Sequence, residues 1–296
     1  MTTVLVAGAG GFLGKNLSEA LGRQDGVILR TCGRSTPIED RNQYLHEADV
    51  IYHLAGVNRP ETEGEFESVN VGISHEICST LTRLDRSPKI VFSSSIQAGL
   101  NKPYGTSKRR AEQELASYAE QRAASVIIYR FVNVFGKWCR PNYNSVVATF
   151  CHNIANGIPI DIHDPDRSLD LIYVDDAVSC LLSHLGDNGN AGETVFADAT
   201  PVHSIDLKTL SETIMTFKDI RSTLRIPDFS DRFTHNLYAT YLSYLPSQEF
   251  SYPLDQKVDP RGVLAEFLKS PHLGQIFVSR TKPGITRGNH YHDSAP

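Results

Sequence analysis

The sequence predicts an α/β protein whose strands form a doubly wound parallel sheet. Short apolar runs alternate with longer stretches of helical spacing from residue 2 to about residue 185. The runs are apolar almost throughout, which suits strands that are buried on both faces of a parallel sheet. The first run leads straight into a glycine-rich turn and then a helix, the order that opens a Rossmann-type domain. A parallel sheet with helices on both faces accounts for all three observations.

Five strands and three helices are expected in this region. The strands are Thr3–Ala7, Val27–Cys32, Val50–Leu54, Lys89–Ser93 and Ser125–Tyr129. The helices are Gly14–Arg23, Ser74–Leu84 and Thr106–Gln121, which have helical spacing. Strands and helices that alternate in this way are joined by right-handed crossovers.

The second part of the chain has a different texture. Residues 186–230 form a smaller mixed region with a helix near Asp206–Phe217. After about residue 245 the chain contains Pro246, Pro253 and Pro260, and two stretches have strand character, Val263–Phe267 and Gln275–Arg280. We therefore expect one domain over residues 1–245, made of the Rossmann core and a substrate-binding region. A partial β segment is expected over residues 246–296.

The composition excludes several classes of protein. The formal net charge is −5 over 296 residues, with 29 Lys+Arg against 34 Asp+Glu, so no basic face is available for nucleic acid. No apolar run approaches the ~18 residues that span a bilayer, and the N-terminus has no signal-peptide pattern. The five cysteines are scattered without a C-x-x-C pair, which argues against a disulfide framework or a zinc ribbon. We expect a cytoplasmic protein that binds neither nucleic acid nor membrane.

The glycine-rich turn has the spacing of a dinucleotide-binding site. Gly8, Gly11 and Gly14 follow the first strand, with Phe12 and Leu13 inside the motif. The first glycine permits the tight turn, the second lets the backbone approach a phosphate, and the third lets the helix pack on the strand. The helix N-terminus then presents N–H groups and the positive end of its dipole to the pyrophosphate. The alternative is a glycine turn of purely steric origin.

The end of the second strand favours NADP(H) over NAD. An NAD site has an acidic residue here for the ribose 2′-hydroxyl, but this chain has none until Glu39. Arg34 can instead pair with a 2′-phosphate, with Ser35 or Thr36 donating to the same group. The alternative for Arg34 is a solvated surface arginine.

The third strand ends in a short stretch that we add to the cofactor site. Leu54, Ala55 and Gly56 lie where a flat ring can approach the backbone. His53, just before them, is expected to be a packed strand residue rather than a catalytic base or a metal ligand.

Tyr104 and Lys108 are four residues apart, on one face of the same predicted helix. A tyrosine with its ordinary pKa of ~10 is a poor acid–base group at neutral pH. An ammonium beside it lowers that pKa, so that a proton can move to or from a substrate oxygen. The preceding strand ends in Ser93, Ser94 and Ser95, where a hydroxyl can hydrogen-bond a reacting carbonyl. The alternative is a surface pair of tyrosine and lysine.

These motifs together resemble the extended short-chain dehydrogenase/reductase family, or NAD-dependent epimerase/dehydratase family, over about residues 1–245. The matching stretches are Gly8–Gly14, Asp49–Gly56, Ser93–Ser95, Tyr104–Lys108, Arg130–Gly136 and Tyr173–Asp176. The resemblance implies that Ser95, Tyr104 and Lys108 are catalytic, with Ser94 as the reserve candidate, and that Tyr104 and Lys108 also contact the cofactor. It further implies a nucleotide-sugar substrate, with contacts from Ser94, Asn133, Arg140 and Asn144.

Two departures from the family pattern bear on the reaction. Only eight residues separate Ser95 from Tyr104, so the loop that often covers the substrate is trimmed. Dehydratases of the family carry an acidic pair near this strand end, whereas Ser95 is followed here by Ile96, Gln97 and Ala98. Elimination of water is therefore disfavoured, and a 4-epimerase with bound NAD or a net 4-ketoreductase remains. Because the predicted cofactor is NADPH rather than a bound NAD, net reduction is favoured over epimerisation. The third hypothesis is a nucleotide-binding sensor without catalytic activity.

The C-terminal segment has the beginning of a metal motif. Residues 284–292 have the spacing G-x5-H-x-H that opens a cupin site, in which His290 and His292 point the same way from a strand. The acidic ligand and the third histidine of such a site are not reached by residue 296, and the alternative is a disordered tail. Zinc is therefore expected only if the cupin segment is complete.

Over its whole length the chain resembles the CapF family of capsular-polysaccharide enzymes, in which a short-chain reductase domain precedes a cupin domain. The stretches that carry this resemblance are His53–Pro60, Phe135–Val146, Tyr241–Pro246 and Asp259–Gly262. The resemblance implies reduction of a UDP-4-keto-6-deoxy-N-acetylhexosamine, towards UDP-N-acetyl-L-fucosamine. It also implies a C3-epimerase in the cupin half. We expect that activity to be missing, Val258–Pro296 to be poorly ordered or dependent on a partner, and the chain to form a homodimer.

Overall fold

The computed structural model describes residues 1–187, 189–271, 274–286 and 288. Contacts divide the chain into two compact units. The first contains residues 1–149 and 162–207, and the second contains residues 150–161 and 208–296. The predicted boundary at residue 245 falls inside the second unit, and the division into functional domains there stays a prediction. Among the described residues, no helix is long and apolar enough to cross a membrane.

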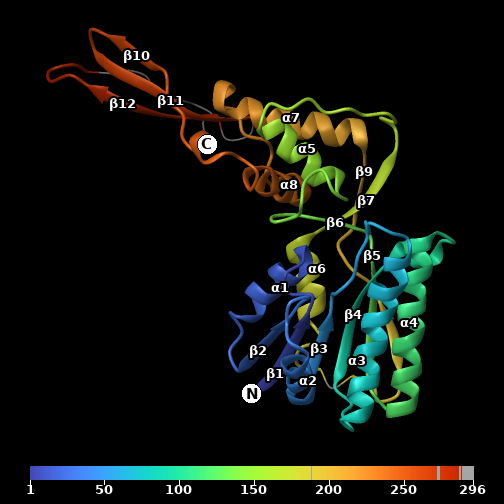
Figure 1. Cartoon of the computed structure of the whole chain (residues 1–296). Coiled ribbons are helices and arrows are strands. Elements are labelled where there is room, and N and C mark those ends of the chain that lie inside the picture. The colour runs from blue at the N-terminus through green and yellow to red at the C-terminus, as the bar shows by residue number, and fades with distance from the viewer. Residues whose placement is uncertain (188, 272–273, 287, 289–296) are drawn as a thin grey trace. The chain divides into compact units, whose positions relative to one another are not determined.

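The first unit is built on six parallel strands in the order β2-β1-β3-β4-β5-β8 (Figure 1). Their bounds are β1 Thr2–Ala7, β2 Val27–Cys32, β3 Val50–His53, β4 Lys89–Ser95, β5 Val126–Phe131 and β8 Thr194–Ala197. Val4 at the centre of β1 lies opposite Leu29 on one side and Val50 on the other, in parallel register. The predicted fold class is confirmed, and all five predicted strands are present.

Helices cover both faces of this sheet (Figure 1). On one face lie α1 (Phe12–Leu21) and α6 (Val174–Leu182), where Leu17 and Leu181 share an apolar cluster with Val6. On the other face lie α2 (Ile38–Glu47), α3 (Gly72–Arg83) and α4 (Pro103–Arg122), in the cluster of Leu81, Leu115 and Ile51. Each such fully buried side chain contributes about 1.5–3 kcal/mol to folding. The sheet is therefore a rigid platform whose carboxyl edge carries the loops.

A second, three-stranded sheet begins at that carboxyl edge. β6 (Asn133–Phe135) is separated from β5 by a single residue and pairs in parallel with β7 (Ser168–Tyr173). β7 in turn pairs antiparallel with β9 (His203–Asp206). Because these strands are short and interrupted by polar residues, the sequence did not predict this sheet. It brings residues 167–171 beside residues 131–134 at one end of the first sheet.

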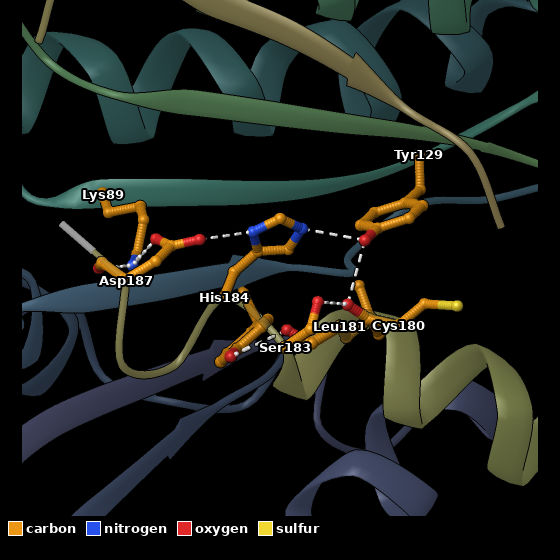
Figure 2. A network of polar contacts seen from close by, with 8 residues as sticks. Lys89, Tyr129, Cys180, Leu181, Ser183, His184 and Asp187 are labelled. Carbon is orange, nitrogen blue, oxygen red and sulfur yellow. Dashed lines mark hydrogen bonds and ion pairs between the residues drawn. The ribbon is translucent and has the colours of Figure 1, made fainter. Parts of the chain in front are cut away.

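A polar network fastens the segment after α6 to the first sheet (Figure 2). Lys89 at the start of β4 donates to the Asp187 carboxylate at 2.6 Å and also to the Asp187 carbonyl. The other carboxylate oxygen lies 2.8 Å from Nδ1 of His184, whose Nε2 lies 2.8 Å from the hydroxyl of Tyr129. Tyr129 donates to the Cys180 carbonyl at 2.9 Å. These contacts join β4 and β5 to the end of α6.

The second unit contains helices that pack through aromatic residues. α7 (Leu207–Thr223) contributes Phe217, whose ring centroid lies 5.9 Å from that of Tyr241 in α8 (Arg232–Leu242). The unit also takes in the second half of α5 (Val146–Ala155). Asp231 caps the N-terminus of α8, and its carboxylate accepts hydrogen bonds from the N–H groups of Phe233 and Thr234, a cap worth about 1 kcal/mol.

The same unit contains a three-stranded antiparallel sheet, in the order β10-β11-β12. Its strands are β10 Gln256–Asp259, β11 Gly262–Ser270 and β12 Gly274–Thr281. The two strands predicted here are confirmed. The strands pair locally, since consecutive antiparallel strands can do so without the rest of a barrel. That Val258–Pro296 is poorly ordered or dependent on a partner stays a prediction.

Candidate active site

A cleft of about 950 Å³ opens at the carboxyl edge of the parallel sheet, and all its lining residues belong to the first unit. Most of the residues predicted to bind or react line this cleft together. They are Gly11, Phe12, Leu13, Gly14, Arg34, Leu54, Gly56, Ser94, Ser95, Tyr104, Lys108, Asn133, Arg140 and Asn144. Gly8 and Ala55 are not part of the lining. They contact one another beneath it.

The glycine turn is shaped by close backbone contacts. Gly8 has a φ of +90°, and a Cβ on it would lie 2.6 Å from the backbone nitrogen of Ala55. A Cβ on Gly14 would lie 2.2 Å from the Gly8 carbonyl oxygen. The Gly11 N–H donates to that same carbonyl at 3.0 Å, and α1 begins at the next residue. The tight turn therefore places the N-terminus of α1 directly at the cleft.

The loop after β3 is held by a buried asparagine that the sequence analysis missed. Asn70 lies in the short π-helical turn η1 (Phe66–Val71) and is 2% exposed. Its Oδ1 accepts from the Val57 N–H at 2.7 Å, and its Nδ2 donates to the Val57 carbonyl at 3.0 Å. Nδ2 also donates to the Ser107 hydroxyl at 2.9 Å, which fastens the loop to α4.

Lys108 is buried beside the cleft, with 5% of its surface exposed. Its ammonium donates to the Ser93 carbonyl at 2.6 Å and lies 4.2 Å from the centroid of the Phe92 ring. Burial lowers the pKa of Lys108 to about 7, against the opposing effect of the Glu112 carboxylate. Lys108 therefore exchanges its proton close to neutral pH when no ligand is bound.

Tyr104 and Ser95 are brought together, as predicted. Ser95 ends β4 and caps the short 3₁₀ turn η2 (Ile96–Gly99), accepting from the Gln97 N–H at 3.2 Å. Burial raises the pKa of the Tyr104 phenol, and a hydrogen bond with Ser95 opposes that rise. The prediction that the pKa of Tyr104 is lowered is wrong for the net direction, because the loss of solvent raises this pKa by more than the hydrogen bond with Ser95 lowers it. At neutral pH Tyr104 is a protonated phenol.

The short connection between Ser95 and Tyr104 closes because of a glycine. A Cβ on Gly105 would lie 2.1 Å from the carbonyl oxygen of Gln97, so only glycine lets η2 pack directly on the first turn of α4. The eight intervening residues thus form a compact turn that keeps Tyr104 next to Ser95. Gly105, immediately after the tyrosine, was the sequence signal for this contact.

Ser94 and Ser95 have different partners, which separates the two hydroxyl candidates. Ser94 donates to the carboxylate of Glu112, which is buried on α4. The same carboxylate accepts from Arg130 in β5, at 3.0 Å from Nε and 2.6 Å from Nη2. The Ser95 hydroxyl therefore contacts Tyr104, while the Ser94 hydroxyl belongs to a contact between β4 and α4.

His53 is confirmed as a packed strand residue. It is fully buried, its Nε2 lies 2.9 Å from the Ser74 hydroxyl, and its ring lies 4.9 Å from that of Phe92. Burial and the neighbouring Lys108 lower the pKa of His53 to about 3, so the imidazole stays neutral.

The far wall of the cleft carries polar and aromatic groups. Asn133 donates to the Asp170 carbonyl at 3.1 Å across the second sheet. The guanidinium of Arg140 lies 5.1 Å from the Tyr143 ring, and that of Arg59 lies 5.9 Å from the same ring. Arg140 and Asn144 are exposed on this wall. It can therefore present donors to an anionic or hydroxyl-rich ligand.

Arg34 and the predicted metal ligands His290 and His292 are the remaining residues of the predicted sites. Arg34 is exposed after β2 and lines the cleft, as does Lys15 of α1. His290 and His292 lie outside the described residues. Within the described ranges, no group of three or more His, Cys, Asp and Glu side chains is arranged to hold a metal ion.

Comparison with family models gives two matches. A model described as NAD dependent epimerase/dehydratase family matches residues 4–196. A model described as Polysaccharide biosynthesis C-terminal domain matches residues 257–295. The first match contains the glycine turn, Ser95, Tyr104 and Lys108, and the second falls on the C-terminal antiparallel sheet.

Individual proteins and structures give a finer comparison. A UDP-2-acetamido-2,6-beta-L-arabino-hexul-4-ose reductase of Pseudomonas aeruginosa is 39% identical over 291 residues, which are 98% of this chain and 78% of the relative. The crystal structure of the capsular polysaccharide assembling protein CapF from Staphylococcus aureus is 43% identical, with a TM-score of 0.87 over 98% of this chain and 78% of that one. A UDP-glucuronic acid 4-epimerase from Bacillus cereus, solved with NAD, is 18% identical. With a TM-score of 0.66 over 82% of this chain and 96% of that one, it shares the fold.

Proposed function

Since the chain belongs to the NAD dependent epimerase/dehydratase family, we propose that it is an NADPH-dependent reductase of a nucleotide sugar. The substrate is a UDP-2-acetamido-6-deoxy-hexul-4-ose, and the reaction reduces its C4 keto group to an alcohol. The product is a precursor of a capsule or another surface polysaccharide, on the route to UDP-N-acetyl-L-fucosamine. A reductase fed by NADPH and a UDP-sugar works in the cytoplasm, where both are made.

One observation carries this proposal. The Ser95–Tyr104 pair, Lys108 and the glycine turn all reach one cleft, in a chain that is 39% identical to a reductase of such a keto sugar over 98% of its length. A proton donor and a dinucleotide cradle in one cleft are the two things that reduction of a ketone requires.

The glycine turn fits a dinucleotide. Its backbone leaves no room for a Cβ on Gly8 or Gly14, so the first N–H groups of α1 stay available to a pyrophosphate. Gly11, Phe12 and Leu13 would hold the phosphates, and Leu54, Ala55 and Gly56 would flank the rings. The reduced cofactor, when bound, supplies the hydride that reaches C4. The exposed Arg34 would pair with a 2′-phosphate, which selects NADPH over NADH.

Tyr104 is the proton donor of the reaction. It begins as a neutral phenol because burial raises its pKa, and it gives its proton to the C4 oxygen. The phenolate left behind is stabilised by the Ser95 hydroxyl and by the ammonium of Lys108, one helical turn away. A raised pKa suits an acid in a reduction, since the proton must still be on the phenol when the substrate arrives.

The substrate is held by the far wall of the cleft. Asn133, Arg140 and Asn144 line it, and the Arg140 guanidinium is exposed for an anion such as a diphosphate. After Ser95 come Ile96, Gln97 and Ala98, which supply no carboxyl group for the elimination of water. The site therefore favours transfer at C4 without dehydration.

The experiment adds the keto sugar to protein and NADPH and follows the absorbance of the reduced nicotinamide. We expect one NADPH to be consumed per sugar, and the rate of Tyr104→Phe to fall by roughly 10²–10⁴-fold. A 4-epimerase would interconvert sugars without net consumption of NADPH, and that result would contradict the proposal. If Tyr104→Phe kept the wild-type turnover, Tyr104 would not be the proton donor. Sedimentation of the same preparation tests the expected homodimer.

A further inference from the structure

Behind the proposed site lies a buried carboxylate that the mechanism above does not use. Glu112 is 3% exposed and lies on α4 one turn beyond Lys108 and two turns beyond Tyr104. Residues four apart on a helix share one face, so these three side chains form a single row. A buried carboxylate is costly unless its charge is matched, so its surroundings indicate its role.

The Glu112 carboxylate accepts three hydrogen bonds. Arg130 supplies two of them as a fork, at 3.0 Å and 2.6 Å, and the Ser94 hydroxyl supplies the third. Ser94 and Arg130 face each other in the register of β4 and β5. The two hydrogen bonds from the guanidinium are charge-assisted and hold the carboxyl group in one geometry. That group lies one helical turn from Lys108 on α4.

Building on the proposed function, we propose that Glu112 is a positioning residue of the reductase centre. Its carboxylate turns the Ser94 hydroxyl toward α4 and leaves Ser95 as the hydroxyl that serves Tyr104. The same charge balances the ammonium of Lys108, whose own hydrogen bond goes to a neutral carbonyl.

The surroundings of Lys108 explain why a balancing charge is needed. Its ammonium lies over the Phe92 ring and donates to the Ser93 carbonyl, which are both uncharged partners. Burial lowers the pKa of Lys108, and Glu112 opposes that change. Without Glu112 more of Lys108 would be neutral at a given pH, and the Tyr104 phenolate would lose its nearest cation.

The first test compares Glu112→Gln with the wild type by measuring kcat/KM for NADPH-dependent reduction against pH. Glutamine keeps the shape of the side chain and removes its charge. We expect the alkaline limb of the profile to move to lower pH by about one unit, because Lys108 loses its proton earlier. Glu112→Asp, which keeps the charge, should move the limb back toward the wild type. Glu120→Gln, on the exposed end of the same helix, is the matched control and should leave the profile unchanged.

If Glu112→Gln instead loses activity equally at every pH and its alkaline limb does not move, the proposal is overturned. Glu112 would then only support the fold. If Glu112→Gln does not fold, Glu112→Asp, which keeps the charge, is expected to keep the limb close to its wild-type position. A limb that moves down by about one unit in that variant counts against the proposal, because the charge is still present.

A second measurement needs no turnover and separates this proposal from the proposed function. In protein labelled with ¹³C-lysine, the Cε resonance of Lys108 is assigned by its loss in Lys108→Met and followed against pH. The midpoint should be lower in Glu112→Gln than in the wild type. Coinciding midpoints would overturn the role of Glu112 even if the wild type reduces the keto sugar. A wild type that consumes no NADPH would refute the proposed function and leave this titration to decide on Glu112.

Discussion

Lys89 and Lys108 are both buried in the first unit, and their partners differ in kind. Lys89, 7% exposed, donates to the Asp187 carboxylate at 2.6 Å, in the network that runs on through His184 to Tyr129 (Figure 2). Lys108, 5% exposed, donates to the neutral carbonyl of Ser93 at 2.6 Å. One ammonium is matched by a carboxylate in direct contact, and the other is not.

We propose that this difference distinguishes a structural lysine from a functional one. In an ion pair of the Lys89 type, a buried ammonium is bound to a carboxylate at the surface, which fastens two segments and directs the charge at its partner. A buried ammonium bonded to a carbonyl keeps a charge that can act on a third group, and its pKa falls to about 7. Lys108 and Tyr104 both line the cleft, and we propose that the phenol is the group on which Lys108 acts. Burial alone does not reveal a functional lysine, but the nature of its partner does.

The largest expected effect comes from replacing each lysine in turn. Lys108→Met should lower the rate of NADPH-dependent reduction by roughly 10²–10⁴-fold, because the Tyr104 phenolate loses its cation. Lys89→Met should leave the rate of the folded protein within about twofold and lower its melting temperature instead, since it removes a fastening contact. Steady-state kinetics and thermal melting of both variants check this. A larger loss of rate in Lys89→Met than in Lys108→Met would break the comparison.

Asn70 ties the loop beside Lys108 to α4, and its removal should be the next largest effect. Asn70→Ala leaves the N–H and carbonyl of Val57 without their side-chain partner, which costs about 1–3 kcal/mol of unfolding free energy. The rate should fall by about tenfold, because Ser107 and the first turn of α4 lose an anchor. Urea unfolding and kinetics on one preparation measure both. If Asn70→Ala has the wild-type free energy of unfolding and the wild-type rate, the loop is held by other contacts.

Arg34 lines the cleft as an exposed cation, in contrast to the buried cations Lys89 and Lys108. Arg34→Ala should raise the KM for NADPH by about tenfold and leave the KM for NADH nearly unchanged, because only NADPH carries the 2′-phosphate. Kinetics with both cofactors, at one ionic strength, provide the check. An equal rise for both cofactors would mean that Arg34 does not read the 2′-phosphate.

The last expected effect is on stability as a function of pH and does not involve turnover. In the folded protein Lys108 loses its proton near pH 7, whereas in the unfolded chain its pKa is the ordinary 10.5. Between these values the unfolded chain binds more protons, so this group makes the folded state more stable as pH rises. The free energy of unfolding of the wild type, relative to that of Lys108→Met, should therefore increase from about pH 6.5 to about pH 9. A constant difference across this range would argue against a lowered pKa.

The parts of the fold that depend on local patterns were predicted well from the sequence. The five parallel strands, the glycine turn and the Tyr104–Lys108 spacing each depend on a few neighbouring residues. β8 and the sheet of β6, β7 and β9 were missed, because their strands are short and half-exposed and are defined by pairing with distant residues. His290 and His292 remain a prediction.

The supporting residues of the site were missed for a related reason. Asn70 contacts Ser107, 37 residues away, and Glu112 contacts Arg130, 18 residues away, so neither contact can be seen in a local motif. Glu112 did carry one signal, its spacing of four from Lys108 on the predicted helix. The direction of the Tyr104 pKa was misjudged because the sequence shows the lysine but not the loss of solvent.

The transfer of hydride to C4 is the central claim, and isotope transfer tests it most directly. NADPH carrying deuterium at the transferable position of its nicotinamide is incubated with the protein and the UDP-4-keto sugar. Mass spectrometry and NMR then locate the label in the product. The account predicts one deuterium at C4 of the sugar for each NADPH consumed, with the label nearly absent when Tyr104→Phe is used. A sugar product that forms at the same rate without deuterium at C4 would contradict it.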